Sequence, residues 1–171
     1  MEIRSATVAD AAGIARVHVS SWQGAYAGLI PERDLLGLDV KQFESWRSRR
    51  IQAMDRANSD TLVAVSDDGV AGFVDVGPTR DEHLDPSRVG ELYAIYLHPS
   101  HWDQGHGRRL ITEAEDAMRR LGFESAMLWV LEENARARQF YEAAGWRHDG
   151  GRQLERIIDT ELYEVRYTKD L

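Results

Sequence analysis

Two glycines separated by one residue carry the clearest chemical signal in the sequence. They are Gly105 and Gly107, which follow a turn at Pro99 and precede Arg108 and Arg109. Glycine lets a backbone approach a ligand closely or adopt conformations that a Cβ forbids, and the free N–H groups at the start of a helix bind anions. The spacing therefore predicts a cradle for a phosphate-bearing ligand, beside which the two arginines add positive charge.

Two familiar phosphate-binding patterns do not fit these glycines. A Walker loop needs Gly, four residues and then Gly-Lys-Ser or Gly-Lys-Thr, and no such run occurs in the chain. A dinucleotide fingerprint needs a third glycine where Leu110 stands, and no acidic residue ends a strand about 20 residues later. A third design remains, in which a strand splays from its neighbour and leads into a helix whose first N–H groups hold a pyrophosphate.

The composition is typical of one soluble domain, spanning residues 1–171. Of the 171 residues, 43% are hydrophobic and 29% are charged. A formal net charge of -8 opposes nucleic-acid binding, which needs a basic face. The chain has no cysteine, which excludes disulfides, thiolate zinc sites and a cysteine nucleophile. Because no signal peptide or run of about 18 apolar residues is present, we expect a cytoplasmic protein without membrane partners.

The hydrophobic pattern predicts an α/β fold with a mixed sheet. Period-2 or continuous apolar runs predict strands at 2–7, 61–66, 70–77, 89–99 and 125–131, and two more in the last 26 residues. Period-3.6 patterns predict helices near 8–22, 41–57 and 108–121 and after a cap at Asn134. Residues 23–31 are expected to form an irregular apolar loop. We therefore predict about seven strands, mostly antiparallel, flanked by about four helices.

The segment at residues 134–146, "NARARQFYEAAGW", strengthens the interpretation of the glycine turn. It is similar to the second cofactor segment of the GNAT superfamily of N-acetyltransferases, which reads Asn-x-x-Ala-x-x-Phe-Tyr-Glu-x-x-Gly-aromatic. The stretch "LYAIYLHPSHWDQGHGRRLI" resembles the acetyl-CoA-binding core of the same superfamily, except that Trp102 stands where Gln or Arg is usual. The resemblance covers most of the chain in strand order but only the second half in motifs. It implies an acyl-CoA N-acyltransferase fold that is splayed at the fourth strand.

The resemblance also implies a set of acetyl-CoA contacts. The backbone at the end of the fourth strand meets the oxyanion and the pantetheine, the amides of the turn hold the pyrophosphate, and the second segment lies beside the thioester. These residues are Ile95, Tyr96, Leu97, Asp103, Gln104, Gly105, His106, Gly107, Arg108, Asn134, Ala137 and Tyr141. No metal is expected, because Pro99 prevents a helix that would align His98 with His101.

Two residues match catalytic positions of the superfamily. Tyr141 matches a phenol that protonates the leaving thiolate, although a helix tyrosine packed on the sheet is the plainer interpretation. Glu91 matches an acidic residue that removes the amine proton and contacts the substrate, or it is a solvated carboxylate at a strand start. Strand alternation would aim Glu91, Tyr93, Ile95 and Leu97 to one side, unless a β-bulge intervenes.

Trp22 and Tyr26 match the region where relatives build the acceptor pocket, or they anchor a loop. The arginine-rich run at 47–56 is expected to be a solvated helix face. The resemblance implies transfer of acetyl from acetyl-CoA to a primary amine of a small molecule, and the lack of cysteine favours direct transfer in a ternary complex. The alternatives are a protein or peptide N-terminal acetyltransferase and a non-catalytic acyl-CoA sensor. Dimerisation is common in the superfamily, and a homodimer is compatible with the sequence.

Overall fold

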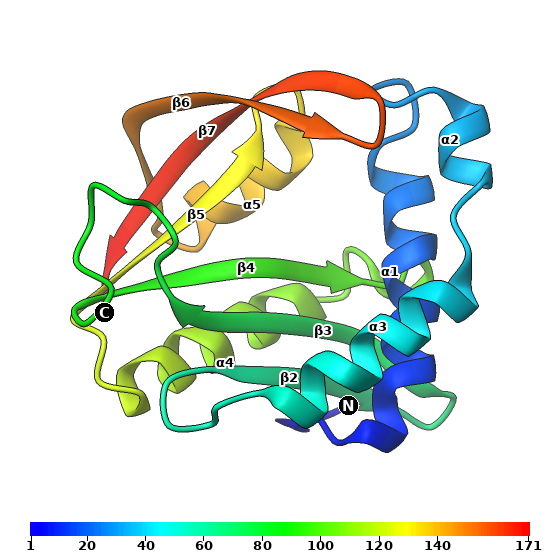
Figure 1. Cartoon of the computed structure of the whole chain (residues 1–171), viewed down its shortest axis with the longest axis horizontal. Helices are drawn as coiled ribbons and strands as arrows, with labels where there is room; N and C mark the ends of the chain where they lie inside the picture. The colour runs from blue at the N-terminus through cyan, green and yellow to red at the C-terminus, as the bar shows by residue number, and fades with distance from the viewer.

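Seven strands form one sheet in the order β1-β2-β3-β4-β5-β7-β6 (Figure 1). The computed structural model describes the whole chain, residues 1–171. Its strands are β1 (Glu2–Ser5), β2 (Asp60–Ser66), β3 (Gly69–Pro78), β4 (Val89–Leu97), β5 (Ser125–Leu131), β6 (Arg147–Ile157) and β7 (Thr160–Asp170). All neighbouring pairs are antiparallel except β4 and β5, which run parallel. The predicted mixed, mostly antiparallel sheet is confirmed.

The parallel pair is also where the sheet opens. Only Val89, Gly90 and Glu91 of β4 pair with β5, and beyond them the two strands diverge. In Figure 1 they start side by side near the C-terminus and fan apart toward the C-terminal end of α1 (Ala11–Ala25). Past Glu91, the backbone groups of β4 that face β5 have no strand partner and are available to a ligand. The predicted splay at the fourth strand is confirmed.

Helices cover both faces of the sheet. α1 and α3 (Val40–Ala53) pack on one face, where a small apolar cluster joins Ile14, Ile51 and Phe73. α4 (His106–Arg120) and α5 (Ala135–Ala143) pack on the other, and their apolar residues belong to the larger core. The short α2 (Glu32–Leu36) adds a fifth α-helix, which starts after Pro31 in a stretch for which no helix was predicted. No helix is long and apolar enough to span a membrane.

The alternation predicted for β4 is wrong because a β-bulge interrupts it. Asp75 pairs with Ala94 whereas Val76 pairs with Leu92, so Tyr93 is the extra residue. As a result, Leu92 and Ile95 both pack against the larger core although they are three residues apart. The alternation of side chains in β4 is therefore reversed after Tyr93, and the side chains of Glu91 and Ile95 lie on opposite faces of the sheet.

The arginine-rich run of α3 is not uniformly solvated, which corrects a second prediction. Arg47 is only 1% exposed, and its guanidinium donates to the buried carboxylate of Asp75 at 2.5 Å. Thr61 donates to the other oxygen of Asp75, and Arg47 also contacts the Nδ1 atom of His18. A buried charge needs such partners because it has lost water. This network lies beneath the face of the sheet that carries α1.

Candidate active site

A cleft of about 730 Å³ lies where β4 and β5 diverge. Its walls come from residues 92–97 of β4, residues 129–131 of β5, the start of α4 and one side of α5. Tyr26 at the end of α1 and Glu164 of β7 complete it. A volume of this size is typical of sites for drug-sized ligands, which occupy about 300–1,000 Å³.

The two glycines of the turn meet different structural needs. Gly105 is the N-cap of α4 and has a φ of 78°, a left-handed conformation that favours glycine. Gly107 lies in the first turn of α4, where a Cβ would be 3.3 Å from Cε2 of Phe140 in α5. Gly105 therefore directs the chain into the helix, and Gly107 lets α5 pack closely on it. Both line the cleft, so the N–H groups at the start of α4 open onto it.

Trp102, the departure from the expected pattern, ties the turn to the rest of the cleft. Its Nε1–H donates to the carbonyl of Leu97 at 2.7 Å, and its ring contacts Gly24 of α1 closely enough to leave little room for a Cβ there. The guanidinium of Arg136 lies 4.3 Å from the ring centroid and also pairs with Asp103. Trp102 thus lines the cleft and connects the glycine turn with β4 and α5.

Three tyrosines, Tyr26, Tyr96 and Tyr141, line the middle of the cleft and the side that is closed by Tyr26 and Glu164, here called the acceptor side. Tyr141 of α5 is buried, and its hydroxyl makes no hydrogen bond within the protein. The hydroxyls of Tyr26 and Tyr96 lie 3.3 Å apart. Burial raises the pKa of all three phenols above the usual value, so they are protonated at neutral pH. Tyr141 therefore presents a free O–H donor to the cleft.

Glu91 lies outside the cleft, which differs from its predicted position. Its side chain is 2% exposed, and both carboxylate oxygens are engaged by Arg80. The Arg80 guanidinium donates to Oε1 at 2.5 Å and 3.2 Å, and the Arg80 backbone N–H donates to Oε2 at 2.8 Å. The physical reason is the loop after β3, which starts opposite Glu91 and folds Arg80 over the carboxylate.

The side chains of three other predicted residues also lie outside the cleft, although for Gln104 and His106 the prediction concerned the backbone N–H groups. Trp22 packs between α1 and α3, against the rings of His18 and Phe43. Gln104 is exposed and donates to the carbonyl of Ser100, and the His106 ring faces His101 rather than the cleft. The structure does bring together most of the predicted set: Tyr26, Ile95, Tyr96, Leu97, Asp103, Gly105, Gly107, Arg108, Asn134, Ala137 and Tyr141.

Asn134 combines a structural position with a place in the cleft. Its side-chain oxygen accepts a hydrogen bond from the backbone N–H of Ala137 at 3.1 Å, which confirms the predicted N-cap of α5. The cap fixes the start of α5 and so the direction in which the helix presents Tyr141.

Four of the cleft-lining side chains that the sequence-based reasoning did not assign to the site have polar or aromatic groups that could contact a ligand. They are Trp129, Arg136, Gln139 and Glu164. Arg136 and Gln139 lie within the recognised second segment at positions where its motif specifies no residue. Trp129 and Glu164 lie within strands whose patterns look ordinary. Only the pairing of β5 with β7 places Glu164 opposite Leu131 at the edge of the cleft.

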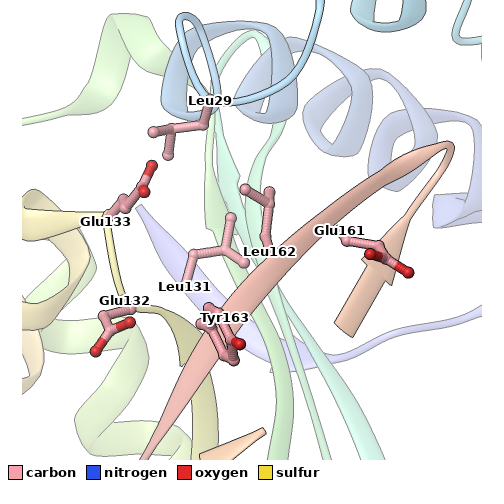
Figure 2. Close-up of a pocket in the computed structure, with 7 residues that line it drawn as sticks. All are labelled: Leu29, Leu131, Glu132, Glu133, Glu161, Leu162 and Tyr163. Atoms are coloured by element: carbon pink, nitrogen blue, oxygen red, sulfur yellow. The ribbon is translucent and has the colours of Figure 1, made fainter. Parts of the chain in front are cut away.

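A second, smaller hollow of about 80 Å³ adjoins the acceptor side of the cleft. Figure 2 shows the side chains of Leu29, Leu131 and Leu162 around it, and Leu131 also lines the larger cleft. Three glutamates and a tyrosine complete its lining: Glu132, Glu133, Glu161 and Tyr163. The charge of Glu132 is already paired with Arg152 at 2.8 Å.

Comparison with known proteins agrees with this geometry. Residues 26–146 match the model of the acetyltransferase (GNAT) family. An uncharacterised N-acetyltransferase of Bacillus subtilis, YuaI, is 38% identical over 134 residues, which are 77% of this chain and 72% of the relative. A spermidine N(1)-acetyltransferase of Thermoplasma acidophilum is 24% identical over 86% of this chain and 88% of its own length.

A solved structure shows the same architecture with a ligand in place. The acetyltransferase YncA of Salmonella typhimurium, described as putative and determined with its cofactor acetyl-CoA, superimposes with a TM-score of 0.71. The match covers 99% of this chain and 93% of that chain at 22% identity. The fold is therefore shared with a protein that holds acetyl-CoA.

Proposed function

The chain belongs to the acetyltransferase (GNAT) family, and we propose that it transfers acetyl from acetyl-CoA directly to a primary amine of a small molecule. One observation carries this proposal. The glycine cradle and the free, protonated hydroxyl of Tyr141 open onto the same cleft at the divergence of β4 and β5. A protein that only bound acyl-CoA would need the cradle but would have no use for the phenol.

The donor half of the cleft suits CoA. In our proposal the pyrophosphate accepts hydrogen bonds from the backbone N–H groups of residues 105–108, where the helix dipole of α4 favours an anion. Arg108 and Arg136 line the same end and add positive charge. The pantetheine runs along the unpaired edge of β4. The pantetheine contacts residues of this edge that precede Leu97. The Leu97 carbonyl is not available to it, because it already accepts hydrogen bonds from Ser21 and Trp102.

The chemistry needs an acid for the departing sulfur. The amine attacks the thioester carbonyl carbon, and a backbone N–H of β4 near Ile95 stabilises the oxyanion. Tyr141 then gives its proton to the thiolate of CoA, and burial favours this role because it keeps the proton on the phenol. Transfer is direct because the chain has no cysteine that could carry an acetyl intermediate.

The acceptor is proposed to be a small amine, such as an amino acid, a polyamine or an amino sugar. A relative that is named as a spermidine N(1)-acetyltransferase supports this class. The position of Tyr26 beside Tyr96 also supports it, because aromatic walls contact the methylene groups or the charge of such molecules.

The test is release of thiol from acetyl-CoA across a panel of small amines and short peptides. We expect turnover on at least one small amine, and we expect Tyr141→Phe to lower kcat by about 10²-fold or more, the usual contribution of a general acid. Tyr167→Phe is the matched control, because it removes a phenol that is bonded to Glu142 and Arg138 outside the cleft.

Three outcomes would redirect the proposal. Faster turnover on peptides than on every small amine would identify a peptide acetyltransferase. Tight binding of acetyl-CoA with no turnover on any acceptor would identify a sensor. Equal rates for Tyr141→Phe and the wild type would remove Tyr141 from the mechanism.

A further inference from the structure

We propose that Glu164 of β7 binds the ammonium group of the acceptor and takes its proton, so that the acceptor is a cationic alkylamine. This inference rests on the proposed acetyl transfer and identifies the substrate class and the base of that reaction.

The fold points Glu164 into the cleft from the acceptor side. Its neighbours Val165 and Tyr167 belong to the larger core. Strand alternation therefore places Glu164 on the opposite face of β7 from Val165, the face that carries α1. There it is the cross-strand partner of Leu131 and lines the same cleft as Tyr26.

Glu164 is a carboxylate without a cation. Its hydrogen bond comes from the neutral amide of Gln153 at 3.1 Å, and it forms no ion pair with any lysine, arginine or histidine. Asp103, the other carboxylate that lines the cleft, is paired with Arg136 at the phosphate end. A half-buried carboxylate that has no ion-pair partner in the protein is stabilised by a cation from outside, and an alkylammonium group is such a cation.

The groups around Glu164 suit a base. Burial raises its pKa, the hydrogen bond from Gln153 and the charge of Arg80 lower it, and the negative charges of Glu155 and Glu91 raise it further. The remaining titratable groups nearby are the protonated phenols of Tyr26 and Tyr96, whose pKa values Glu164 raises in turn. A carboxylate of raised pKa accepts a proton more readily near neutral pH than an ordinary one.

The proton balance closes with Glu164 and Tyr141 alone. The ammonium gives one proton to Glu164, which releases it to solvent through the open cleft. The free amine forms the C–N bond and pushes the carbonyl electrons onto oxygen. As the C–S bond breaks, nitrogen gives its second proton to Glu164, and the thiolate takes the proton of Tyr141. The oxyanion electrons return to form the amide carbonyl, Tyr141 regains a proton from solvent, and Glu164 releases its second proton to solvent, so one net proton is released for each amide formed.

Glu91 is less suited to this step. Both of its oxygens are occupied by Arg80, and it does not line the cleft. A carboxylate whose two oxygens already accept hydrogen bonds from Arg80 has no free oxygen directed at an acceptor amine.

The experiment measures kinetics with 1,4-diaminobutane and spermidine as alkylammonium probes and 4-ethylaniline as an amine that is neutral at pH 7. We expect wild-type activity on the alkylammonium probes, and Glu164→Gln to lower kcat/KM for them by about 10²-fold or more. The dissociation constant for acetyl-CoA should change less than twofold, because Glu164 lies at the acceptor side. Between pH 7 and 9.5, the rate of Glu164→Gln should rise about tenfold per unit as free amine forms, and the wild-type rate should level off.

Three controls separate this role from a structural one. Glu164→Asp should recover part of the lost rate, because it restores a carboxylate. Glu113→Gln removes the same charge from the exposed face of α4 and should leave all constants unchanged. Glu91→Gln should not reproduce the altered pH profile.

The outcomes also distinguish this inference from the proposed function. If the wild type acetylates 4-ethylaniline but neither alkylammonium probe, or if Glu164→Gln keeps the wild-type rate and pH profile, then Glu164 is not the base although the acetyl transfer stands. If the wild type acetylates no amine, the proposed function fails first.

Discussion

The two ends of the cleft present different kinds of groups to their substrates. The end that we propose to bind phosphate, here called the phosphate end, presents backbone N–H groups at the start of α4, with Arg108 and Arg136 beside them. The acceptor end presents side chains, chiefly the phenol of Tyr26 and the carboxylate of Glu164. A backbone N–H donor is retained in most substitutions, whereas a single substitution removes a phenol or a carboxylate. We therefore expect donor binding to tolerate sequence change and acceptor recognition to be sensitive to it.

The packing beneath the two ends of the cleft also differs. The larger core under α4 and α5 consists of apolar side chains, and the buried carboxylate of Glu115 beside it is paired with Lys169. The face under α1 contains the buried pair of Arg47 with Asp75 and the ring of His18, which stacks on Tyr96 at 5.1 Å. The stability that comes from apolar packing depends little on pH, whereas the stability of a region with a buried imidazole depends strongly on pH.

The largest expected effect is acid sensitivity of the acceptor end through His18. Burial, with a contribution from the charge of Arg47, lowers the pKa of His18 to about 3. In the unfolded chain a histidine has a pKa of about 6.5, so below this pH the unfolded state binds a proton at residue 18 that the folded state does not bind. Stability should therefore fall as pH drops from about 6.5 toward about 3, by about 1.4 kcal/mol for each pH unit.

Urea denaturation at a series of pH values between 7 and 4 measures this loss. His18→Gln should flatten the dependence between pH 6.5 and 4, because the side chain no longer titrates. His83→Gln, in the exposed loop after β3, is the matched control. An unchanged slope in His18→Gln would show that other groups cause the acid sensitivity.

Gly107→Val tests the close packing behind the donor end. A Cβ at residue 107 would already lie 3.3 Å from Phe140, and overpacking of this kind costs about 1–3 kcal/mol. We expect lower stability in urea and weaker binding of CoA in a titration, because α4 must move away from α5. Adding Phe140→Leu should recover part of both losses, and a failure to do so would place the strain elsewhere.

The smallest effect is expected for Trp102→Gln, which introduces a residue common at this position in the superfamily. The variant loses one hydrogen bond to Leu97, worth about 1 kcal/mol, and the contact with Arg136. We expect less than a tenfold change in the dissociation constant for CoA, measured by calorimetry, because the backbone donors remain. A loss of 100-fold or more would mean that the phosphate end also depends on a side chain.

Much of the donor end was predictable because its signals are local. Gly105 reflects a left-handed φ, and Asn134 reflects a helix cap, and each requirement involves only a few neighbouring residues. The phosphate turn and the cap therefore lie where the spacing placed them. Gly107 is a partial exception, because its second constraint comes from Phe140 in a different helix.

The acceptor end was less predictable because its contacts are distant in sequence. The alternation of β4 failed at the bulge of Tyr93, which depends on how β3 pairs with it. Glu91 looked free until the loop after β3 placed Arg80 on it, and Trp22 looked available until α3 covered it with Phe43.

By itself, the sequence determined the mixed sheet and the glycine turn, because these follow from hydrophobic period and from a backbone conformation that few residues other than glycine adopt. The resemblance of two motifs indicated the family. Only the tertiary structure decided which carboxylate lines the cleft. Glu91 and Glu164 are both glutamates within β-strands, and no local motif shows which of them lines the cleft. Pairing of β7 with β5 brings Glu164 to the cleft without a cation, and the loop after β3 neutralises Glu91. The charge that remains unpaired is set by long-range packing, and no local pattern encodes it.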